Sequence, residues 1–132
     1  DAELVLLTGE PTRQKVLDQP ALCTAEQLLG WQADVRAVKV ASAIADYVLR
    51  LVRESRGDAS FEMGLSPRGG LALMAASRAW ALLQGRDFVT PEDVQAVFAA
   101  VCQHRLRFRS TEDRAGLLHS INDFLNQVDV VA

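Results

Sequence analysis

The chain has 132 residues, 49% of them hydrophobic, which suits one compact domain with a sizeable core. Its formal net charge of −3 at pH 7 offers no attraction for nucleic acid or for an anionic membrane. No apolar run approaches the roughly 18 residues that span a bilayer, and the N-terminus lacks the basic-then-apolar order of a signal peptide. We therefore expect a soluble domain with no nucleic-acid partner and no membrane insertion.

The first 22 residues are typical of a connecting segment. Leu4 and Leu7 mark a short amphipathic helix that ends near Pro11. Because the chain starts with an aspartate and enters this helix at once, we expect it to be a piece of a longer protein. We assign residues 1–22 to a linker helix and connection, and residues 23–132 to one helical domain.

A second helix is signalled shortly after this connection. Thr24, with Gln27 three residues later, has the pattern of a capping box, in which the two side chains satisfy N–H groups at a helix start. The apolar residues that follow are spaced for one face of a helix. We expect that face, with Leu28, Trp31 and Val35, to be buried.

The third helix has the clearest apolar stripe of the sequence. Ser42 is its candidate N-cap. The apolar positions follow the i, i+3, i+4, i+7, i+8 rule and are Ile44, Tyr47, Val48, Leu51 and Val52. We expect this stripe to face the core and the helix to end in the polar run 53–60.

A strong start signal opens the most apolar helix. Ser66 offers a capping hydroxyl, and Pro67 suits the first helical position because its φ is fixed and it has no N–H group. The following residues, LALMAASRAWALLQ, are apolar around most of the helix, which predicts the central, most buried helix with Trp80 in the core. We expect Gly85 to end it in a left-handed conformation.

The last third of the chain predicts two more helices and an extended segment. Thr90 and Pro91 open a helix whose apolar residues are Val94, Val97, Phe98 and Val101. HRLRFR, residues 104–109, alternates like a short strand or extended arm. A closing helix has one apolar face made of Leu117, Leu118, Ile121, Phe124, Leu125 and Val128. The chain is thus predicted to be all-α, a small bundle of five to six helices with a short extended arm.

Several other residues have simple structural interpretations. Cys23 and Cys102 lie far apart, with no CxxC pair and no histidine at metal-ligand spacing, so we expect neither a disulfide scaffold nor a zinc site, as suits a reducing cytoplasm. Arg78 interrupts the apolar helix, and we favour a salt bridge with an acid over an inter-subunit role. We expect a surface position for His119. For the basic residues in 104–109 we favour a solvated arm over a basic strip for a neighbouring subunit or an acidic partner.

GLSPRGG, residues 64–70, is the least expected stretch for a helix start. Arg68 would place a positive charge beside unpaired N–H groups at the positive end of the helix dipole. Gly69 and Gly70 each cost about 1 kcal/mol relative to alanine in a helix interior. Either Arg68 is a solvated loop residue at a frayed start, or it and the helix N-terminus together attract an anion. In the second case the glycines would let the anion or a neighbouring backbone approach closely.

The stretch from residue 64 to 106, GLSPRGGLALMAASRAWALLQGRDFVTPEDVQAVFAAVCQHRL, resembles the C-terminal helical lid of the MoxR branch of AAA+ ATPases. The shared features are an SPR motif opening a helix rich in small residues, an aromatic residue, V-T-P-E-D-V, and a terminal H-R-[LI]. Residues 24–56 are similar to the first two helices of that lid. The two glycines depart from the family, which more usually has alanine or serine there.

The resemblance implies a role for the start of this helix. Arg68 would be the sensor-two arginine, which reaches the terminal phosphates of ATP held, with Mg²⁺, by a large ATPase subdomain. Pro67 and Gly69 would belong to the same nucleotide-binding turn, and Tyr47 is a candidate for the adenine end of the cleft. Residues 1–22 would connect from the large subdomain. The chain lacks the phosphate-cradling loop and the acidic pair that hydrolysis needs, so we expect no ATP hydrolysis and no tight ATP binding by the chain alone.

The implied parent is a cytoplasmic, chaperone-like ATPase, assembled as a hexamer, in which the lid contacts the large subdomain and neighbouring protomers. Its client proteins would include some with von Willebrand A-type domains. The alternative is a stand-alone helical protein-interaction module without nucleotide function, which would explain the apolar helices without Arg68. A DNA-binding helical domain is weaker, because it would need a basic recognition face.

Overall fold

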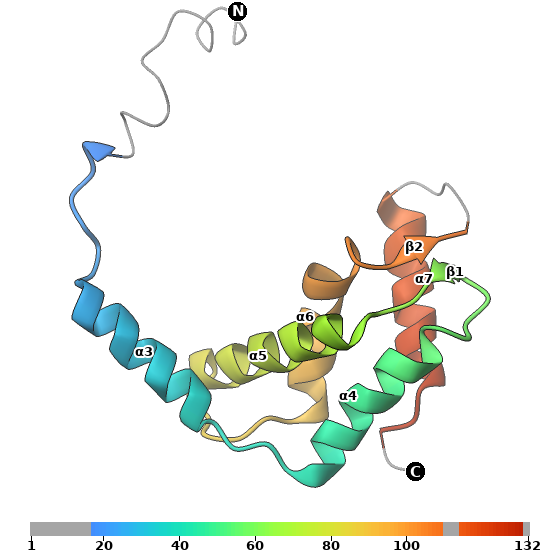
Figure 1. The fold of residues 1–132 in the computed structure, drawn as a ribbon, viewed down its shortest axis with the longest axis horizontal. Coiled ribbons are helices and arrows are strands. Elements are labelled where there is room, and N and C mark those ends of the chain that lie inside the picture. The colour runs from blue at the N-terminus through green and yellow to red at the C-terminus, as the bar shows by residue number, and fades with distance from the viewer. Residues whose placement is uncertain (1–16, 110–113, 131–132) are drawn as a thin grey trace, which may run out of the picture. The chain divides into compact units, whose positions relative to one another are not determined.

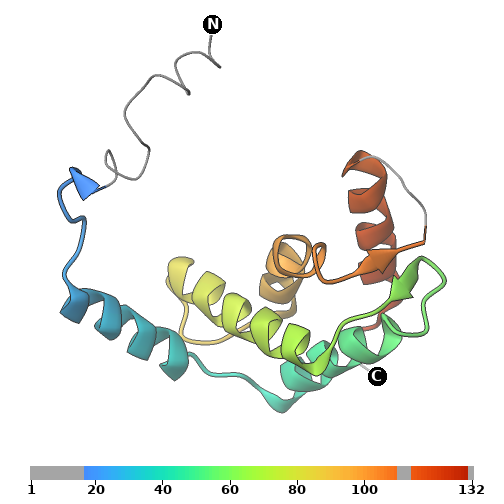
Figure 2. The same cartoon turned by 45° about the horizontal axis from the view of Figure 1, so that its top comes forward.

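The computed structural model describes residues 17–109 and 114–130, which form five helices and one two-stranded sheet (Figures 1 and 2). In chain order these are α3 (Ala25–Ala37), α4 (Ser42–Glu54), β1 (Phe61–Met63), α5 (Pro67–Leu83), α6 (Pro91–Cys102), β2 (Arg107–Phe108) and α7 (Arg114–Gln127). The all-α prediction is confirmed, with a small strand pair added. The helix predicted at Leu4 and Leu7 lies outside the described residues. None of the described helices has the length and apolar character needed to cross a membrane.

The chain divides into two compact units, residues 1–31 and 32–132. In the first unit, the start of α3 carries the predicted capping box. The backbone N–H of Thr24 donates to Oε1 of Gln27 at 2.8 Å, and the N–H of Gln27 donates to Oγ1 of Thr24 at 3.1 Å. The predicted start of this helix is therefore confirmed.

The predicted burial of α3 is wrong. None of its residues is buried; Leu28 is 48% exposed, Trp31 is 52% exposed, and Val35 is only partly covered. The spacing of these residues correctly indicates a helix with an apolar side. Spacing cannot show whether the same chain also contains the surface that covers that side.

The core of the second unit lies among α4, α5, α6 and α7. Its largest fully buried apolar side chains are Tyr47, Phe98, Phe124, Leu51, Leu65, Leu73, Ile121 and Val94. All five residues of the predicted α4 stripe are buried. The cap prediction for Ser42 is wrong, because Ser42 is already inside the helix. Ala41 is the N-cap, and its carbonyl accepts the N–H of Ile44 at 3.0 Å and of Ala45 at 3.2 Å.

The ends of α5 are as predicted. Ser66 is the N-cap, and its hydroxyl accepts the N–H of Gly69 at 3.2 Å. At the other end Gly85 has a φ of +74°, and the N–H of Arg86 returns to the carbonyl of Ala81 at 3.0 Å. This return bond belongs to a Schellman motif, in which a left-handed residue reverses the chain after the last turn.

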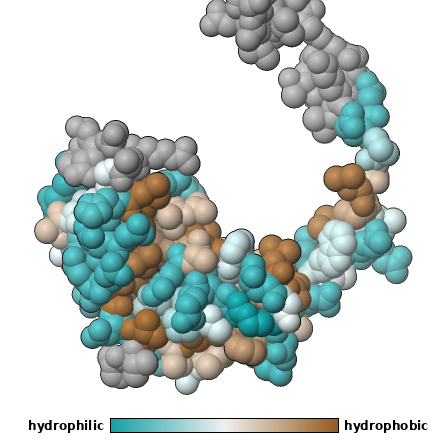
Figure 3. Space-filling view, turned by 180° about the vertical axis from the view of Figure 1, so that it is seen from behind, coloured by the Kyte–Doolittle hydropathy of each residue, from teal (hydrophilic) through white to brown (hydrophobic). Residues whose placement is uncertain are grey.

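The prediction that α5 is the most buried helix, with Trp80 in the core, is wrong. Its buried residues are confined to one face and are Gly69, Gly70, Leu73, Ser77 and Ala81. Leu71 and Leu83 are 74% and 78% exposed, and Trp80, predicted in the core, is 40% exposed. From behind, apolar residues reach the surface in separate patches among hydrophilic ones (Figure 3). A helix that is apolar on most sides can bury any of them, so its sequence does not identify its buried face.

The extended segment after α6 forms β2, which pairs antiparallel with β1, a strand that the sequence did not predict. The ring of Phe61 on β1 stacks edge-on against Phe108 on β2 and against Phe124 on α7, with centroid distances of 5.2 and 5.3 Å. Arg107 pairs with Glu62 across the two strands at 2.8 Å. The segment is therefore a packed strand with exposed basic side chains rather than a free arm.

Candidate functional site at the start of helix α5

Arg68 is the second residue of α5 and is exposed. Its side chain forms no hydrogen bond or ion pair with any other residue that the structure describes. A cation in the first turn of a helix experiences the positive end of the helix dipole. No anionic group of the described residues offsets this charge.

The turn before Arg68 is fixed to the end of α4. The buried hydroxyl of Ser55 accepts the N–H of Leu65 at 2.9 Å and donates to the carbonyl of Val52 at 2.9 Å. The Nε of Arg56 donates to the carbonyl of Leu65, also at 2.9 Å. A Cβ atom added to Gly64 would lie 2.4 Å from the carbonyl oxygen of Ser55, so only glycine fits there. These positioning residues were not predicted from the sequence, although Gly64 stands directly before the L-S-P-R motif.

The two glycines after Arg68 have different surroundings. A Cβ atom on Gly70 would lie 2.9 Å from Cγ2 of Val52, so Gly70 allows α5 to pack closely against α4. A Cβ atom on Gly69 would meet Leu65 at an ordinary 3.5 Å. The N–H groups of both glycines already donate to Ser66, to its hydroxyl and its carbonyl respectively. The close approach expected at Gly70 is therefore made by a side chain of α4.

Tyr47 is fully buried, as expected for a core residue. Its hydroxyl accepts a hydrogen bond from Nε2 of Gln95 on α6 at 3.1 Å. The fold places it on α4 under the surface, whereas Pro67 is exposed beside Arg68. A contact between Tyr47 and adenine stays a prediction.

Arg78 has a partner of a different kind from the one predicted. Its Nη1 donates to the carbonyl of Arg36 at 3.4 Å, and its Nε is buried without a partner. Within residues 17–109 and 114–130 it pairs with no acid, so the predicted salt bridge is wrong there. The end of α3 supplies a backbone carbonyl where we expected a carboxylate.

The ion pair that does fix α5 to α6 was not predicted. Both carboxylate oxygens of Asp93 accept from Arg86, at 2.6 and 2.5 Å, and one also accepts the N–H of Thr90 at 2.8 Å. Asp93 is buried, and the hydrogen bond from Arg86 is the main reason that its pKa lies below the usual value. This pair could not be predicted from the helix pattern, because Arg86 lies outside the helix that contains Asp93, five residues before its first residue.

The remaining titratable candidates lie apart from this turn. Cys23 and Cys102 are free thiols, and burial raises the pKa of the Cys102 thiol to about 12. His119 is 79% exposed and lies 3.2 Å from Asp123, which confirms its surface position. Among the described residues there is no group of three potential metal ligands.

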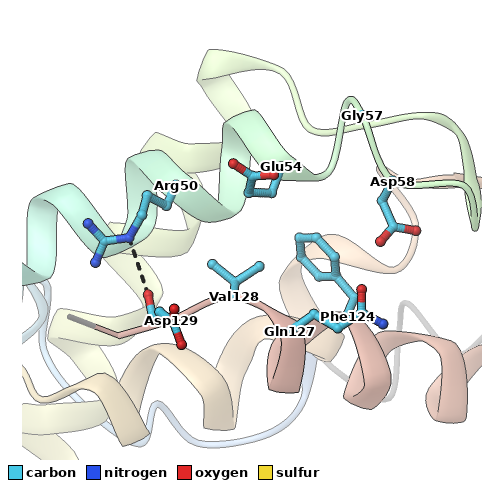
Figure 4. Close-up of a pocket in the computed structure, with 8 residues that line it drawn as sticks. All are labelled: Arg50, Glu54, Gly57, Asp58, Phe124, Gln127, Val128 and Asp129. Carbon is cyan, nitrogen blue, oxygen red and sulfur yellow. Dashed lines mark hydrogen bonds between the residues drawn. The ribbon is translucent and has the colours of Figure 1, made fainter. Parts of the chain in front are cut away.

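A cleft of about 380 Å³ between the ends of α4 and α7 contains none of the predicted site residues (Figure 4). Arg50 on its wall donates to the backbone carbonyls of Asp129, at 3.2 Å, and Val130, at 2.6 Å. Glu54 and Asp58 line the same cleft. Arg50 thus holds the segment after α7 against α4, a structural role.

Comparison with known proteins identifies the fold. Residues 53–126 match the family model described as AAA lid domain. This chain belongs to the AAA lid domain family. It is 37% identical over 104 residues to the uncharacterized protein YeaC of Bacillus subtilis, covering 79% of this chain and 32% of YeaC. It is 41% identical over 73 residues to Chaperone MoxR1 of Mycobacterium tuberculosis, covering 48% of this chain and 19% of MoxR1.

One further relative and one solved structure also match this chain. Protein MoxR of Methylorubrum extorquens is 51% identical over 43 residues, 33% of this chain and 12% of that protein. A crystal structure of a candidate ATPase from Cytophaga hutchinsonii has the same fold, with a TM-score of 0.65 and 24% identity over 74% of this chain and 33% of that one. The chain is thus the C-terminal lid region of a MoxR-family AAA+ ATPase, and it spans about a third of the length of YeaC.

The matched region of the lid includes the whole turn around Arg68, together with Ser55 and Arg56 that fix it. It excludes α3 and Tyr47. The residues that position Arg68 therefore belong to the part of the chain that the family model covers.

Proposed function

We propose that this lid provides a sensor-two arginine, Arg68, which contacts the terminal phosphate of ATP bound by the large subdomain of the full-length protein. The observation that supports this is an exposed guanidinium group, unpaired among residues 17–109 and 114–130, on a turn fixed by Ser55, Arg56 and Gly64. A fixed turn presents the charge in one place, so the arginine loses less freedom when it binds phosphate. ATP and Mg²⁺ would be held by the large subdomain.

The energy of this contact depends on the state of the nucleotide. Hydrogen bonds between arginine and phosphate contribute on the order of 1.5–3 kcal/mol each, enough to shift a two-state equilibrium about tenfold or more. A ligand shifts the equilibrium between two lid positions only by the difference in its binding free energy between those positions. Loss of the terminal phosphate removes the contact of Arg68, so the lid would report hydrolysis by changing position.

We further propose that the full-length protein works as a cytoplasmic, chaperone-like remodelling ATPase, as the name of Chaperone MoxR1 suggests for that relative. In a hexamer, the lid would pass the nucleotide state to the large subdomain and to the neighbouring protomer. Proteins with von Willebrand A-type domains are the client class that we favour.

The test is the rate of ATP hydrolysis by the full-length protein with Arg68→Ala or Arg68→Lys. We expect Arg68→Ala to lower turnover at least about tenfold, as loss of about 1.4 kcal/mol would, and Arg68→Lys to restore only part, because lysine keeps the charge without the planar fork. Arg105→Ala, which removes another exposed arginine, is the matched control. Wild-type turnover by Arg68→Ala would make Arg68 an ordinary surface residue and favour a helical interaction module without nucleotide function.

A further inference from the structure

Helix α4 meets the N-terminal half of α5 (Figures 1 and 2). An open groove lies along this contact. Its volume is about 450 Å³, and eight of its ten lining residues are apolar or glycine. Val48 and Val52 form its buried floor, while Leu49 and Leu71 on its two sides are 43% and 74% exposed. The groove is therefore an apolar surface between two helices, with room for a few apolar side chains.

One end of this groove is basic. Arg53 and Arg56 line it near Pro67. Neither pairs with a carboxylate of the described residues; Arg53 makes no side-chain hydrogen bond there, and Arg56 uses only its Nε. The chain as a whole has a net charge of −3, so two uncompensated arginines at one end of an apolar groove are a local excess of positive charge.

We propose that this groove binds an amphipathic helix of a protein partner, one whose apolar face ends in acidic residues. Leucine-sized side chains would fill the space between Leu49 and Leu71, and the acids would meet Arg53 and Arg56. The groove is lined by side chains of two helices, whose backbone groups are already paired within each helix. An extended peptide would leave its own backbone N–H groups unpaired there, whereas a helix pairs them internally.

The groove has both an apolar floor and a basic end, and this combination favours an amphipathic acidic helix over other anionic ligands. Free phosphate or nucleic acid would use the arginines and gain nothing from Val48, Val52 and Leu71. A purely apolar peptide would leave the arginines uncompensated. Only a ligand with both features matches the whole groove, and charge complementarity of this kind fixes the direction in which the helix binds.

The direct test is fluorescence anisotropy with a labelled synthetic helical peptide that carries leucines one turn apart and glutamates at one end. We expect saturable binding to this chain and to the full-length protein, weakened about tenfold or more by Arg53→Glu or by Leu71→Ser. Arg105→Glu and Leu83→Ser are the matched controls, because Leu83 lies on the same helix, is 78% exposed and does not line the groove. Peptides with lysine in place of glutamate, or serine in place of leucine, should bind at least about tenfold more weakly.

Several results would overturn the proposal. The groove variants could bind the peptide as well as the controls do, or the controls could lose as much affinity as the groove variants. Sedimentation could show that the chain associates with itself through this face and that Leu71→Ser abolishes the association, in which case a second copy occupies the groove. Binding to this chain but not to the full-length protein would mean that the rest of the polypeptide covers it. Circular dichroism of each variant verifies that the helices are retained.

Discussion

Helices α4 and α5 are similar in length but differ in how their buried faces are determined. In α4 every residue of the apolar stripe is buried, and all the charged residues of the helix lie outside that stripe. In α5 apolar residues surround most of the helix, yet only one face is buried and Leu71, Trp80 and Leu83 are exposed. The stripe of α4 leaves one way to pack, whereas the sequence of α5 permits several.

The orientation of α5 is set at its ends and at one glycine. Its first turn is capped by Ser66 and joined to α4 through the turn at Gly64. Its last turn closes with the Schellman motif at Gly85 and continues to Arg86, whose ion pair with Asp93 holds the start of α6. Gly70 allows close contact with α4. These local contacts, rather than the apolar pattern of α5, determine which of its faces is buried.

The largest effect should come from the core face of α4. Leu51→Ala removes a side chain with 0% exposure and should lower the free energy of unfolding by about 2–5 kcal/mol. Leu83→Ala on the exposed side of α5 should change it by less than about 0.5 kcal/mol. Urea denaturation followed by circular dichroism measures both. Equal losses would show that α5 buries its apolar side after all, and that the contrast between the helices is wrong.

This contrast also explains how much of the fold the sequence could predict. Helix starts at Thr24, Ser66 and Thr90 were predictable because capping depends on neighbouring residues only. The stripe of α4 was predictable because it is amphipathic. The exposure of Trp31 and Trp80 could not be predicted, because the burial of a side chain depends on which surfaces the fold brings against its helix.

For the candidate site, local signals predicted the helix start that carries Arg68, and the structure confirms that start. They could not identify Ser55 and Arg56, which lie at the end of α4 and fix the turn before Arg68 through hydrogen bonds to Leu65, nine and ten residues along the chain. They also could not distinguish Gly69 from Gly70. The two glycines differ because a methyl group of Val52 lies close to Gly70, and that position results from the packing of α4 against α5.

The ion pair at the end of α5 should give a smaller effect, with a definite pH dependence. The pKa of Asp93 is lowered in the folded chain, so its contribution is complete above the unfolded value, about 4, and is lost as the pH falls through the folded value. Asp93→Asn should cost about 1.5–3 kcal/mol at pH 7 and should flatten the decline in stability below about pH 4.

Unfolding in urea at a series of pH values tests the predicted effect of Asp93→Asn, with Asp87→Asn as the control. Asp87 also has a lowered pKa, caused mainly by a hydrogen bond from Lys39, but both members of that pair are largely exposed. Exposed pairs contribute little to stability. If the two variants behaved alike, the buried pair would not be what holds the end of α5.

The smallest effect, and the finest test of how α5 meets α4, comes from the two adjacent glycines. Gly70→Ala would place a methyl group 2.9 Å from Val52, so either that side chain or the helix must shift, at a cost of about 1–3 kcal/mol. Gly69→Ala finds ordinary contact distances, and neither glycine has a positive φ. It should therefore stabilise the chain by up to about 1 kcal/mol, because alanine restricts the unfolded chain and favours helix.

The double variant Gly70→Ala with Val52→Ala removes the methyl group that causes the clash and should recover part of the loss, relative to Val52→Ala alone. If Gly70→Ala were as stable as Gly69→Ala, close contact at Gly70 would not be what sets the position of α5 against α4.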